Sequence, residues 1–195
     1  MKPRVVLGIT GASGVVYGLR MLDQLSRRCE TVHLILSRNV VDVIRAESDR
    51  VVSDDPTVEE MLGRPASNVV ICGRSDYFTP PASGSYRHDG MVIAPCSMGT
   101  AARIAGGISN DLMTRSADVC LKERRRLVLM VRETPLSLVH LRNLTAVTEA
   151  GATVLPAAPA FYGRPATLEE AVDTVVARAL QALGMDQDLV RPWAQ

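Results

Sequence analysis

Short runs of apolar residues alternate along the chain with longer segments in which apolar residues recur every three or four positions. A continuous apolar run predicts a strand buried on both faces, whereas the longer period predicts an amphipathic helix. The runs predict strands at Val5–Ile9, Thr31–Leu36, Val69–Cys72, Met91–Ala94, Leu127–Val131 and Thr153–Leu155. The helical pattern covers Val15–Arg28, Val40–Glu47, Val58–Leu62, Gly99–Ile104, Leu112–Arg124, Leu138–Ala150 and a last segment from Thr167 to about Leu183.

This alternation of strands and helices favours right-handed crossovers and a parallel sheet. We expect an α/β fold with one doubly wound parallel sheet between two helical layers, a flavodoxin-like or Rossmann-like three-layer sandwich. No repeat or linker interrupts the pattern, so residues 1–195 are expected to form a single domain. Thr167 and Glu170 predict a capping box at the start of the last helix, and Gly151 and Gly184 predict the ends of the last two helices.

Composition narrows the class of protein. Of 195 residues, 47% are apolar and 22% are charged, which excludes disorder, and the net charge of +1 gives no overall attraction to nucleic acid or membranes. The four cysteines show no CxxC pair and no zinc-ligand spacing, so we expect neither a metal site nor a disulfide framework. The first apolar run is too short for a signal segment or a membrane span. We therefore expect a soluble, cytoplasmic protein.

Candidate chemistry lies in the loops that follow three strands: Thr10–Gly14, Pro95–Thr100 and Arg132–Pro135. Ligands of an open parallel sheet bind outside the carboxyl ends of the strands, and the first two loops have the small and hydroxyl residues that cradle a phosphate. The first loop lacks the third glycine of GxGxxG, and the second strand ends in Ser37-Arg38 without an acidic residue for a ribose. A mononucleotide is thus favoured over a dinucleotide; a tight turn without a ligand is the alternative.

Charged residues near these loops suggest a second anion site. Arg115 and Lys122 lie seven positions apart, so they share a helix face, while Arg132 follows a strand and Arg178 lies in the last helix. Solvated surface charge is the alternative, and we expect it for the triplet 124–126. The long irregular segment 74–89 is expected to be functional or mobile.

Two carboxylates are candidate proton donors. Glu47 ends a helix among small and polar residues, and Glu133 directly follows Arg132. A phosphate beside either carboxylate would raise its pKa and suit it to donate a proton. From spacing alone, a salt bridge to a neighbouring arginine is the favoured alternative.

Eight segments, taken in order, resemble the UbiX family of flavin prenyltransferases over residues 4 to 193. They are Gly8–Gly14, Pro81–Ser85, Ala94–Thr100, Arg115–Asp118, Leu121–Arg125, Arg132–Pro135, Pro156–Tyr162 and Arg191–Trp193. The resemblance implies FMN at a subunit interface, trimers that assemble into dodecamers, and metal-independent transfer of a dimethylallyl group from dimethylallyl monophosphate to N5 and C6 of reduced FMN. It also implies that the prenylated FMN passes to a UbiD-type decarboxylase.

The resemblance further implies roles for individual residues. Those expected to hold FMN are Gly11, Ala12, Ser13, Ser37, Ser97, Met98, Gly99, Thr100 and Arg132. Those expected to bind the dimethylallyl phosphate are Arg115, Lys122, Tyr162 and Arg178, the last two from a neighbouring subunit. Those expected to act in catalysis are Ser13, Glu47, Lys122 and Glu133; Glu133 would protonate the departing phosphate and Glu47 would manage protons near N5.

Physical chemistry agrees with this implied reaction. Positioned cations and a proton donor lower the barrier to ionising an allylic phosphate, and no DDxxD-like cluster is present to hold Mg²⁺ on a diphosphate. The segment 75–85 would form an apolar lid that excludes water. Tyr77 stands where some relatives have Trp, and Met98 is bulkier than in some relatives.

Three other functions remain as alternatives. Flavin-dependent cysteine decarboxylases carry a PxMNxxMW segment, which the stretch 108–115 lacks. An aromatic-acid decarboxylase would need a partner protein to act on a carboxylate. An FMN carrier would need only one phosphate site, whereas the cluster of cations and carboxylates suggests two.

Overall fold

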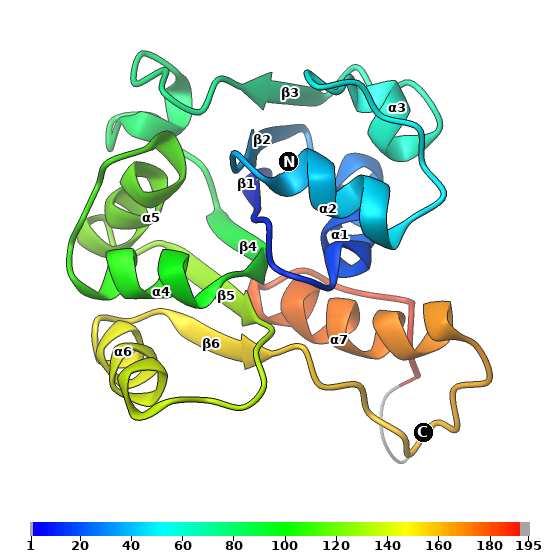
Figure 1. Ribbon diagram of the computed structural model, residues 1–195. Coiled ribbons are helices and arrows are strands. Elements are labelled where there is room, and N and C mark those ends of the chain that lie inside the picture. Colours follow the sequence, from blue (N-terminus) through cyan, green and yellow to red (C-terminus); the bar gives the residue numbers. More distant parts are fainter. Residues whose placement is uncertain (1, 192–195) are drawn as a thin grey trace.

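Six parallel strands form a single sheet at the centre of the molecule (Figure 1). The structure is a computed structural model that describes residues 2–191. The strands are β1 (Arg4–Ile9), β2 (Thr31–Leu36), β3 (Val69–Cys72), β4 (Gly90–Cys96), β5 (Arg126–Val131) and β6 (Thr153–Pro156). Their order across the sheet is β3-β2-β1-β4-β5-β6. This is the Rossmann-like order, and it confirms the predicted doubly wound sheet.

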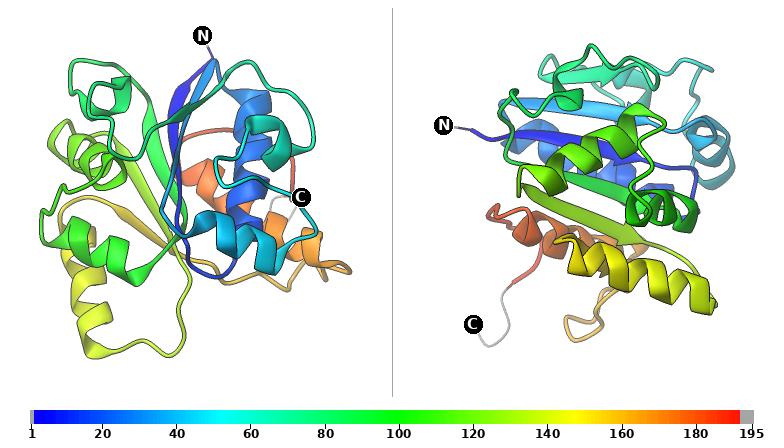
Figure 2. Two further views of the ribbon diagram at one scale, coloured as in Figure 1. Left: turned by 45° about the horizontal axis from the view of Figure 1, so that its top comes forward. Right: turned by 90° about the vertical axis from the view of Figure 1, so that its left-hand side faces the viewer.

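Helices cover both faces of the sheet, as the left view of Figure 2 shows. One face carries α1 (Val15–Arg28), α2 (Val40–Glu47), α3 (Val58–Leu62) and α7 (Leu168–Ala182). The other carries the short 3₁₀ helix η1 (Pro80–Ala82), α4 (Met98–Ala105), α5 (Leu112–Lys122) and α6 (Leu138–Glu149). The predicted three-layer sandwich is therefore confirmed. No helix within residues 2–191 is both long and apolar enough to cross a membrane.

The strands are apolar on both faces because each face has its own core. On β1, Val5, Leu7 and Ile9 pack into one core and Val6 into the other. All seven residues of β4 are buried. This two-sided burial explains why the strands appear in the sequence as continuous apolar runs.

Three local predictions need correction. The predicted break at Pro95 is wrong: β4 runs on to Cys96, and only its pairing with β5 becomes irregular between Ile93 and Cys96. The helix predicted to reach Arg124 ends at Lys122. The Thr167 hydroxyl accepts from the Glu170 amide, but the Glu170 carboxylate accepts from the Ala166 amide instead of Thr167, so the capping box is half formed.

A cluster of two buried imidazole rings and the half-buried ring of Tyr86 fixes the segment that leads into β4. His33 Nε2 lies 2.9 Å from the Tyr86 hydroxyl, and the Tyr86 ring stacks on His88. His88 is 6% exposed, and its Nε2 has no hydrogen-bond partner among the described residues. Burial, reinforced by Arg125, lowers the pKa of His88 from 6.5 to about 4.

We expect acid to destabilise the fold through His88. The pKa of His88 is 6.5 in the unfolded chain and about 4 in the folded chain, so between these pH values only the unfolded chain binds a proton at His88. Stability therefore falls as the pH drops from 6.5 towards 4. Acidification from about pH 7 to about pH 5 should cost about 2 kcal/mol from this residue. Urea unfolding at both pH values measures the loss, and His88→Asn should reduce it. An equal pH dependence in the variant would contradict this assignment.

Candidate active site

A pocket of about 540 Å³ opens at the carboxyl edge of the sheet, where the loops after β1 and β4 diverge. We call it the switch-point pocket, because it lies where the strand order reverses, which is the usual ligand site of an open α/β sheet. Its lining residues are Thr10, Gly11, Ser37, Arg38, Asn39, Arg74, Ser75, Ser97, Thr100, Arg103, Asn110 and Asp111. Five of them were predicted as part of the site or of its loops from the sequence: Thr10, Gly11, Ser37, Ser97 and Thr100.

Hydrogen bonds join the three loops that form the pocket. The Thr10 hydroxyl donates to the Pro95 carbonyl at 2.7 Å and accepts from the Ser97 amide at 3.0 Å. The Gly11 amide donates to Ser37 Oγ at 2.9 Å. Thr10 therefore fixes the β1 loop to the β4 loop, and Ser37 fixes it to the loop after β2.

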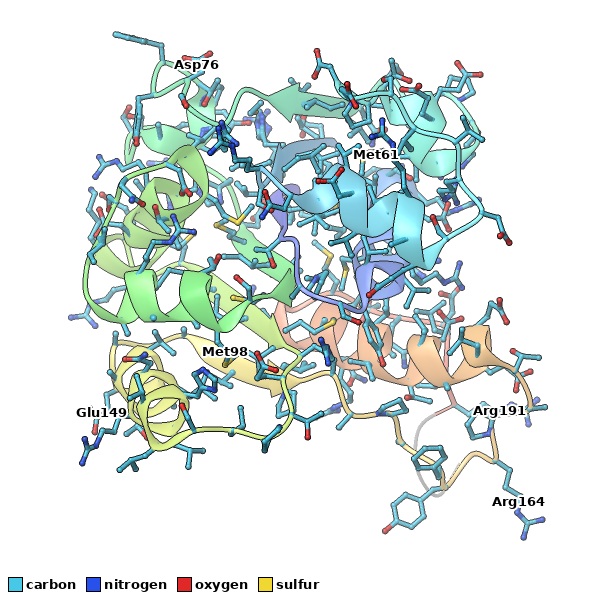
Figure 3. All side chains as sticks on the ribbon, in the orientation of Figure 1. Met61, Asp76, Met98, Glu149, Arg164 and Arg191 are labelled. Carbon is cyan, nitrogen blue, oxygen red and sulfur yellow. The ribbon has the colours of Figure 1, made fainter. Side chains whose placement is uncertain are left out.

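The α4 helix starts at the pocket wall. Ser97 caps it by accepting from the Thr100 amide at 3.3 Å. Gly99 has open space around it, with no atom within 4 Å of where a Cβ would lie. Met98 begins the helix (Figure 3) and is 7% exposed. An anion near Ser97 and Thr100 would thus lie at the positive end of a helix.

The start of α1 is already occupied by Glu47. Its Oε2 accepts from the Gly14 amide at 2.7 Å and from the Val15 amide at 3.0 Å. Burial raises the pKa of Glu47, but hydrogen bonds from Ser13, Val15 and Gly14, together with nearby Arg132, outweigh it, so the pKa lies below its ordinary value. In this arrangement, without a phosphate beside it, Glu47 is an ionised acceptor, and the upward shift expected beside a bound phosphate stays a prediction.

Arg132 and Glu133 follow β5 at the same edge of the sheet. Arg132 Nε donates to the Ser13 carbonyl at 3.0 Å, which brings the β5 loop against the β1 loop. Glu133 is exposed, and its Oε1 accepts from the Thr134 amide at 3.1 Å. Ser13, Glu47 and Arg132 thus form one connected group, with Glu133 directly beside it in the chain. Ala12 lies in the same β1 loop.

Arg115 and Lys122 face a different segment. Arg115 Nε donates to the Ala82 carbonyl at 3.1 Å and its Nη1 to Asp118 at 2.9 Å. Lys122 pairs with Glu123, and a Cβ on Gly84 would lie 2.7 Å from Lys122 Nζ. The prediction that both cations share one helix face is confirmed, and that face packs on the segment 82–84.

The triplet 124–126 is not simply solvated charge. Arg125 donates to the Gly84 and Tyr86 carbonyls at 2.6 and 2.8 Å, and Arg126 donates to the Leu183 carbonyl at 3.1 Å. Carbonyls that lack partners in irregular segments attract guanidinium groups in this way. Arg125 therefore fastens the segment 84–86 to the end of α5.

Tyr162 and Arg178 lie apart from both groups. Arg178 Nη1 donates to Gln181 at 2.6 Å, and Arg178 lines a second pocket of about 410 Å³ between β6 and α7. Tyr162 belongs to the loop between β6 and α7, which projects away from the sheet with Arg164 in the same loop (Figure 3). Within one chain the predicted substrate residues are therefore divided among three places.

The segment 75–85 does not place an apolar wall over the pocket. Arg74 and Ser75 line the pocket, whereas the rings of Tyr77 and Phe78 are exposed. In the single chain this segment adds polar groups to the pocket, and the apolar lid over a bound flavin stays a prediction. Sequence reasoning missed Asn39, Arg103, Asn110 and Asp111, and it placed Arg74 only within the segment expected to be functional or mobile. For Arg103 a signal was present, since it lies one helical turn after Thr100 on the same face.

Comparison with known proteins gives the family. Residues 1–180 match the Flavoprotein family. The flavin prenyltransferase UbiX of Pseudomonas aeruginosa is 44% identical over 197 residues, covering 98% of this chain and 94% of that protein. The chain belongs to the UbiX family of flavin prenyltransferases. A second UbiX, from a Synechocystis species, is 43% identical over 99% of this chain and 97% of its own length.

Solved structures agree with membership of the UbiX family. AnUbiX (PadA1) in complex with FMN and dimethylallyl pyrophosphate is 41% identical with a TM-score of 0.89, covering 100% of this chain and 99% of that one. A dodecameric FMN-dependent UbiX-like decarboxylase from Escherichia coli O157:H7 is 36% identical with a TM-score of 0.87, covering 98% and 100%. Peptidyl-cysteine decarboxylase EpiD, at 14% identity and a TM-score of 0.61, covers 94% and 99% and shares the fold alone.

Proposed function

We propose that this protein is a flavin prenyltransferase that transfers a dimethylallyl group to FMN without a metal ion. The observation that carries the proposal is the likeness over nearly the whole chain to proteins named flavin prenyltransferases, at about 40% identity. The grouping of Ser13, Glu47 and Arg132 beside the switch-point pocket supports it, because these are residues for which the resemblance implies a role. When bound, FMN supplies the electron-rich acceptor, whose N5 and C6 positions receive the prenyl group.

The switch-point pocket fits the phosphate of FMN. Ser37, Ser97 and Thr100 provide hydroxyls there, α4 presents its positive end, and the lining holds more arginines than carboxylates. A phosphate monoester is a dianion at neutral pH, so the donor set and the charge match it. We infer that Gly11, Ala12, Ser13, Met98, Gly99 and Arg132 complete the cofactor site around this phosphate.

We infer that the substrate phosphate site is completed by neighbouring subunits. Within residues 2–191, Lys122 lies beside Gly84 and Glu123, Arg178 lines the separate pocket between β6 and α7, and Ser13 lies in the β1 loop against Arg132. A phosphate that contacts all three groups therefore needs more than one chain. A trimer-based dodecamer would provide this, and the exposed apolar residues Leu138, Val139 and Leu141 on α6 give the chain surface to bury.

Each polar group then has a distinct role. Arg115, Lys122, Tyr162 and Arg178 would bind the dimethylallyl phosphate and stabilise the charge that gathers on it as it leaves, and Lys122 would first have to leave Glu123. Glu133 would give the departing phosphate its proton. Glu47 would hold the β1 loop through Gly14 and Val15 and accept protons near N5. Ser13 would serve both the flavin and the phosphate.

We further infer that dimethylallyl monophosphate is the donor and that a UbiD-type decarboxylase receives the prenylated FMN. The protein would do this in the cytoplasm, where its four buried, unpaired cysteines stay reduced. The AnUbiX structure contains the pyrophosphate, so the donor is best decided by competition. Equal amounts of both donors with limiting enzyme should yield product mainly from the monophosphate.

Mass spectrometry tests the activity itself. The purified protein is incubated without oxygen with reduced FMN and dimethylallyl monophosphate, and the extracted flavin is weighed. We expect the flavin mass to rise by one C5 unit in the presence of a chelator. Unmodified FMN that still co-purifies would overturn the transferase and favour an FMN carrier or a decarboxylase subunit.

A further inference from the structure

The switch-point pocket carries two positive charges in excess. Its lining includes Arg38, Arg74 and Arg103 against the single carboxylate of Asp111. Among residues 2–191, the side chains of Arg38 and Arg74 have no ion-pair partner, whereas Arg103 is paired with Asp111. An excess of two matches the charge of about −2 on a phosphate monoester. The unpaired Arg38 and Arg74 supply the electrostatic attraction for the phosphate, so the paired Arg103 has a different role.

Arg103 is held rigidly in the pocket wall. Its Nη1 donates to Asp111 Oδ2 at 2.6 Å and to Asn110 Oδ1 at 2.9 Å. Asp111 is itself fixed as the N-cap of α5, because it accepts from the Thr114 amide and hydroxyl at 2.8 and 2.7 Å. Burial raises the pKa of Asp111, but the hydrogen bonds from Thr114 and Arg103 hold it below its ordinary value, so the carboxylate stays ionised.

The Thr100 hydroxyl receives two hydrogen bonds. Arg103 Nη2 donates to Thr100 Oγ1 at 3.2 Å, and Ser97 Oγ donates to the same oxygen at 3.0 Å. A guanidinium can only donate, so the hydroxyl hydrogen must point away from Arg103. Among the described residues no hydrogen bond donated by the Thr100 hydroxyl is found, although Thr100 is only 3% exposed and lines the pocket. That hydrogen is therefore available to a ligand in the pocket.

We propose that Arg103 is a positioning residue for the cofactor phosphate: fixed by Asp111 and Asn110, it orients the Thr100 hydroxyl so that its hydrogen is donated to a phosphate oxygen at the start of α4. The proposal rests on the proposed function only in taking FMN as the ligand. Because Asp111 neutralises Arg103, its contribution is directional, and we expect it to depend little on salt. The contributions of Arg38 and Arg74 should weaken strongly with salt.

Comparing two flavins tests this role. Riboflavin has the same ring system as FMN but no phosphate, so its affinity reports on every effect of a substitution other than the loss of phosphate contacts. Arg103→Met should weaken FMN binding about 10-fold, measured by flavin fluorescence, and change riboflavin binding less than about 2-fold. Arg27→Met is the matched control, because it breaks an exposed ion pair with Asp23 at the far end of α1. It should change neither affinity.

A double variant separates positioning from general damage. Thr100→Val should itself cost about 10-fold in FMN affinity, and adding Arg103→Met should cost little more if Arg103 acts through Thr100. The proposal would be overturned if the two substitutions reduced FMN affinity multiplicatively in the double variant. It would also be overturned if Arg103→Met lost riboflavin binding as strongly as FMN binding, or if it left FMN binding unchanged. Prenyl transfer by the unaltered chain is measured separately. A chain that fails to prenylate yet shows the coupled FMN loss would contradict only the proposed function.

Discussion

Glu133→Gln should bind FMN with unchanged affinity but lose most of its prenyl-transfer rate. Glutamine keeps the shape of the side chain and an oxygen that can accept from the Thr134 amide, as Glu133 Oε1 does at 3.1 Å. It cannot give a proton to the departing phosphate. Loss of a general acid typically costs about 100- to 10,000-fold in rate. Single-turnover prenylation with FMN and dimethylallyl monophosphate at saturating concentrations measures the chemical step directly.

The control for this substitution is Glu149→Gln. Glu149 is an exposed carboxylate at the end of α6 (Figure 3), so its loss changes the charge of the protein by the same amount away from the pocket. It should prenylate normally. If Glu133→Gln also turned over normally, Glu133 would have no part in proton transfer, and its carboxylate would be a loop contact only. A donor with a better leaving group should recover part of the rate lost in Glu133→Gln, because such a group needs less help from an acid.

Most of the fold could be predicted because the core is divided between two faces of one sheet. Strands such as β4 are apolar at every position, and helices such as α1 repeat at helical spacing, so both patterns are distinct in the sequence. Pro95 misled the prediction, because proline usually interrupts a strand. Here β4 continues past it, and the Pro95 carbonyl accepts from both the amide and the hydroxyl of Thr10.

The site could be predicted only in part. Strand-end loops can be located from the order of elements, which is why Gly11, Ser37 and Ser97 were found. Arg103 could have been found from its place one helical turn after Thr100, but Arg38 and Arg74 lie in two other segments without a shared spacing, so nothing in the sequence indicated that all three meet in one pocket. The hydrogen bonds from the Gly14 and Val15 amides to Glu47 could not be predicted, because they depend on how α2 packs beside the β1 loop.

The role that the third glycine has in a GxGxxG loop is taken here by a glycine outside that loop. The chain does use a glycine for close approach between the first helix and the sheet, but it lies at Gly18, four residues after Gly14. A Cβ at Gly18 would lie 2.4 Å from the Ala94 carbonyl oxygen and 3.0 Å from Ile9 Cγ2. Both neighbours belong to the strands that flank the switch point. Gly18 thus lets α1 lie close to β1 and β4, which positions the loops of the pocket.

Gly18→Ala should therefore destabilise the protein, although alanine is the better helix former. Replacing glycine in a helix normally stabilises by up to about 1 kcal/mol, whereas a clash with a strand backbone costs about 3 kcal/mol, so we expect a net loss of about 2 kcal/mol. Urea unfolding of the flavin-free protein measures it. Gly99→Ala is the matched control, because Gly99 lies in α4 with nothing within 4 Å of its would-be Cβ, and its stability should stay equal or rise.

The sign of the change decides between two explanations of Gly18. A gain in stability would mean that helix propensity dominates and that α1 can shift away from β4 at little cost. A loss, accompanied by weaker FMN binding, would mean that the distance between α1 and the sheet is coupled to the pocket. We expect the second result, because the Thr10 hydroxyl in the β1 loop donates to the Pro95 carbonyl directly after Ala94. A displacement of α1 would strain this hydrogen bond.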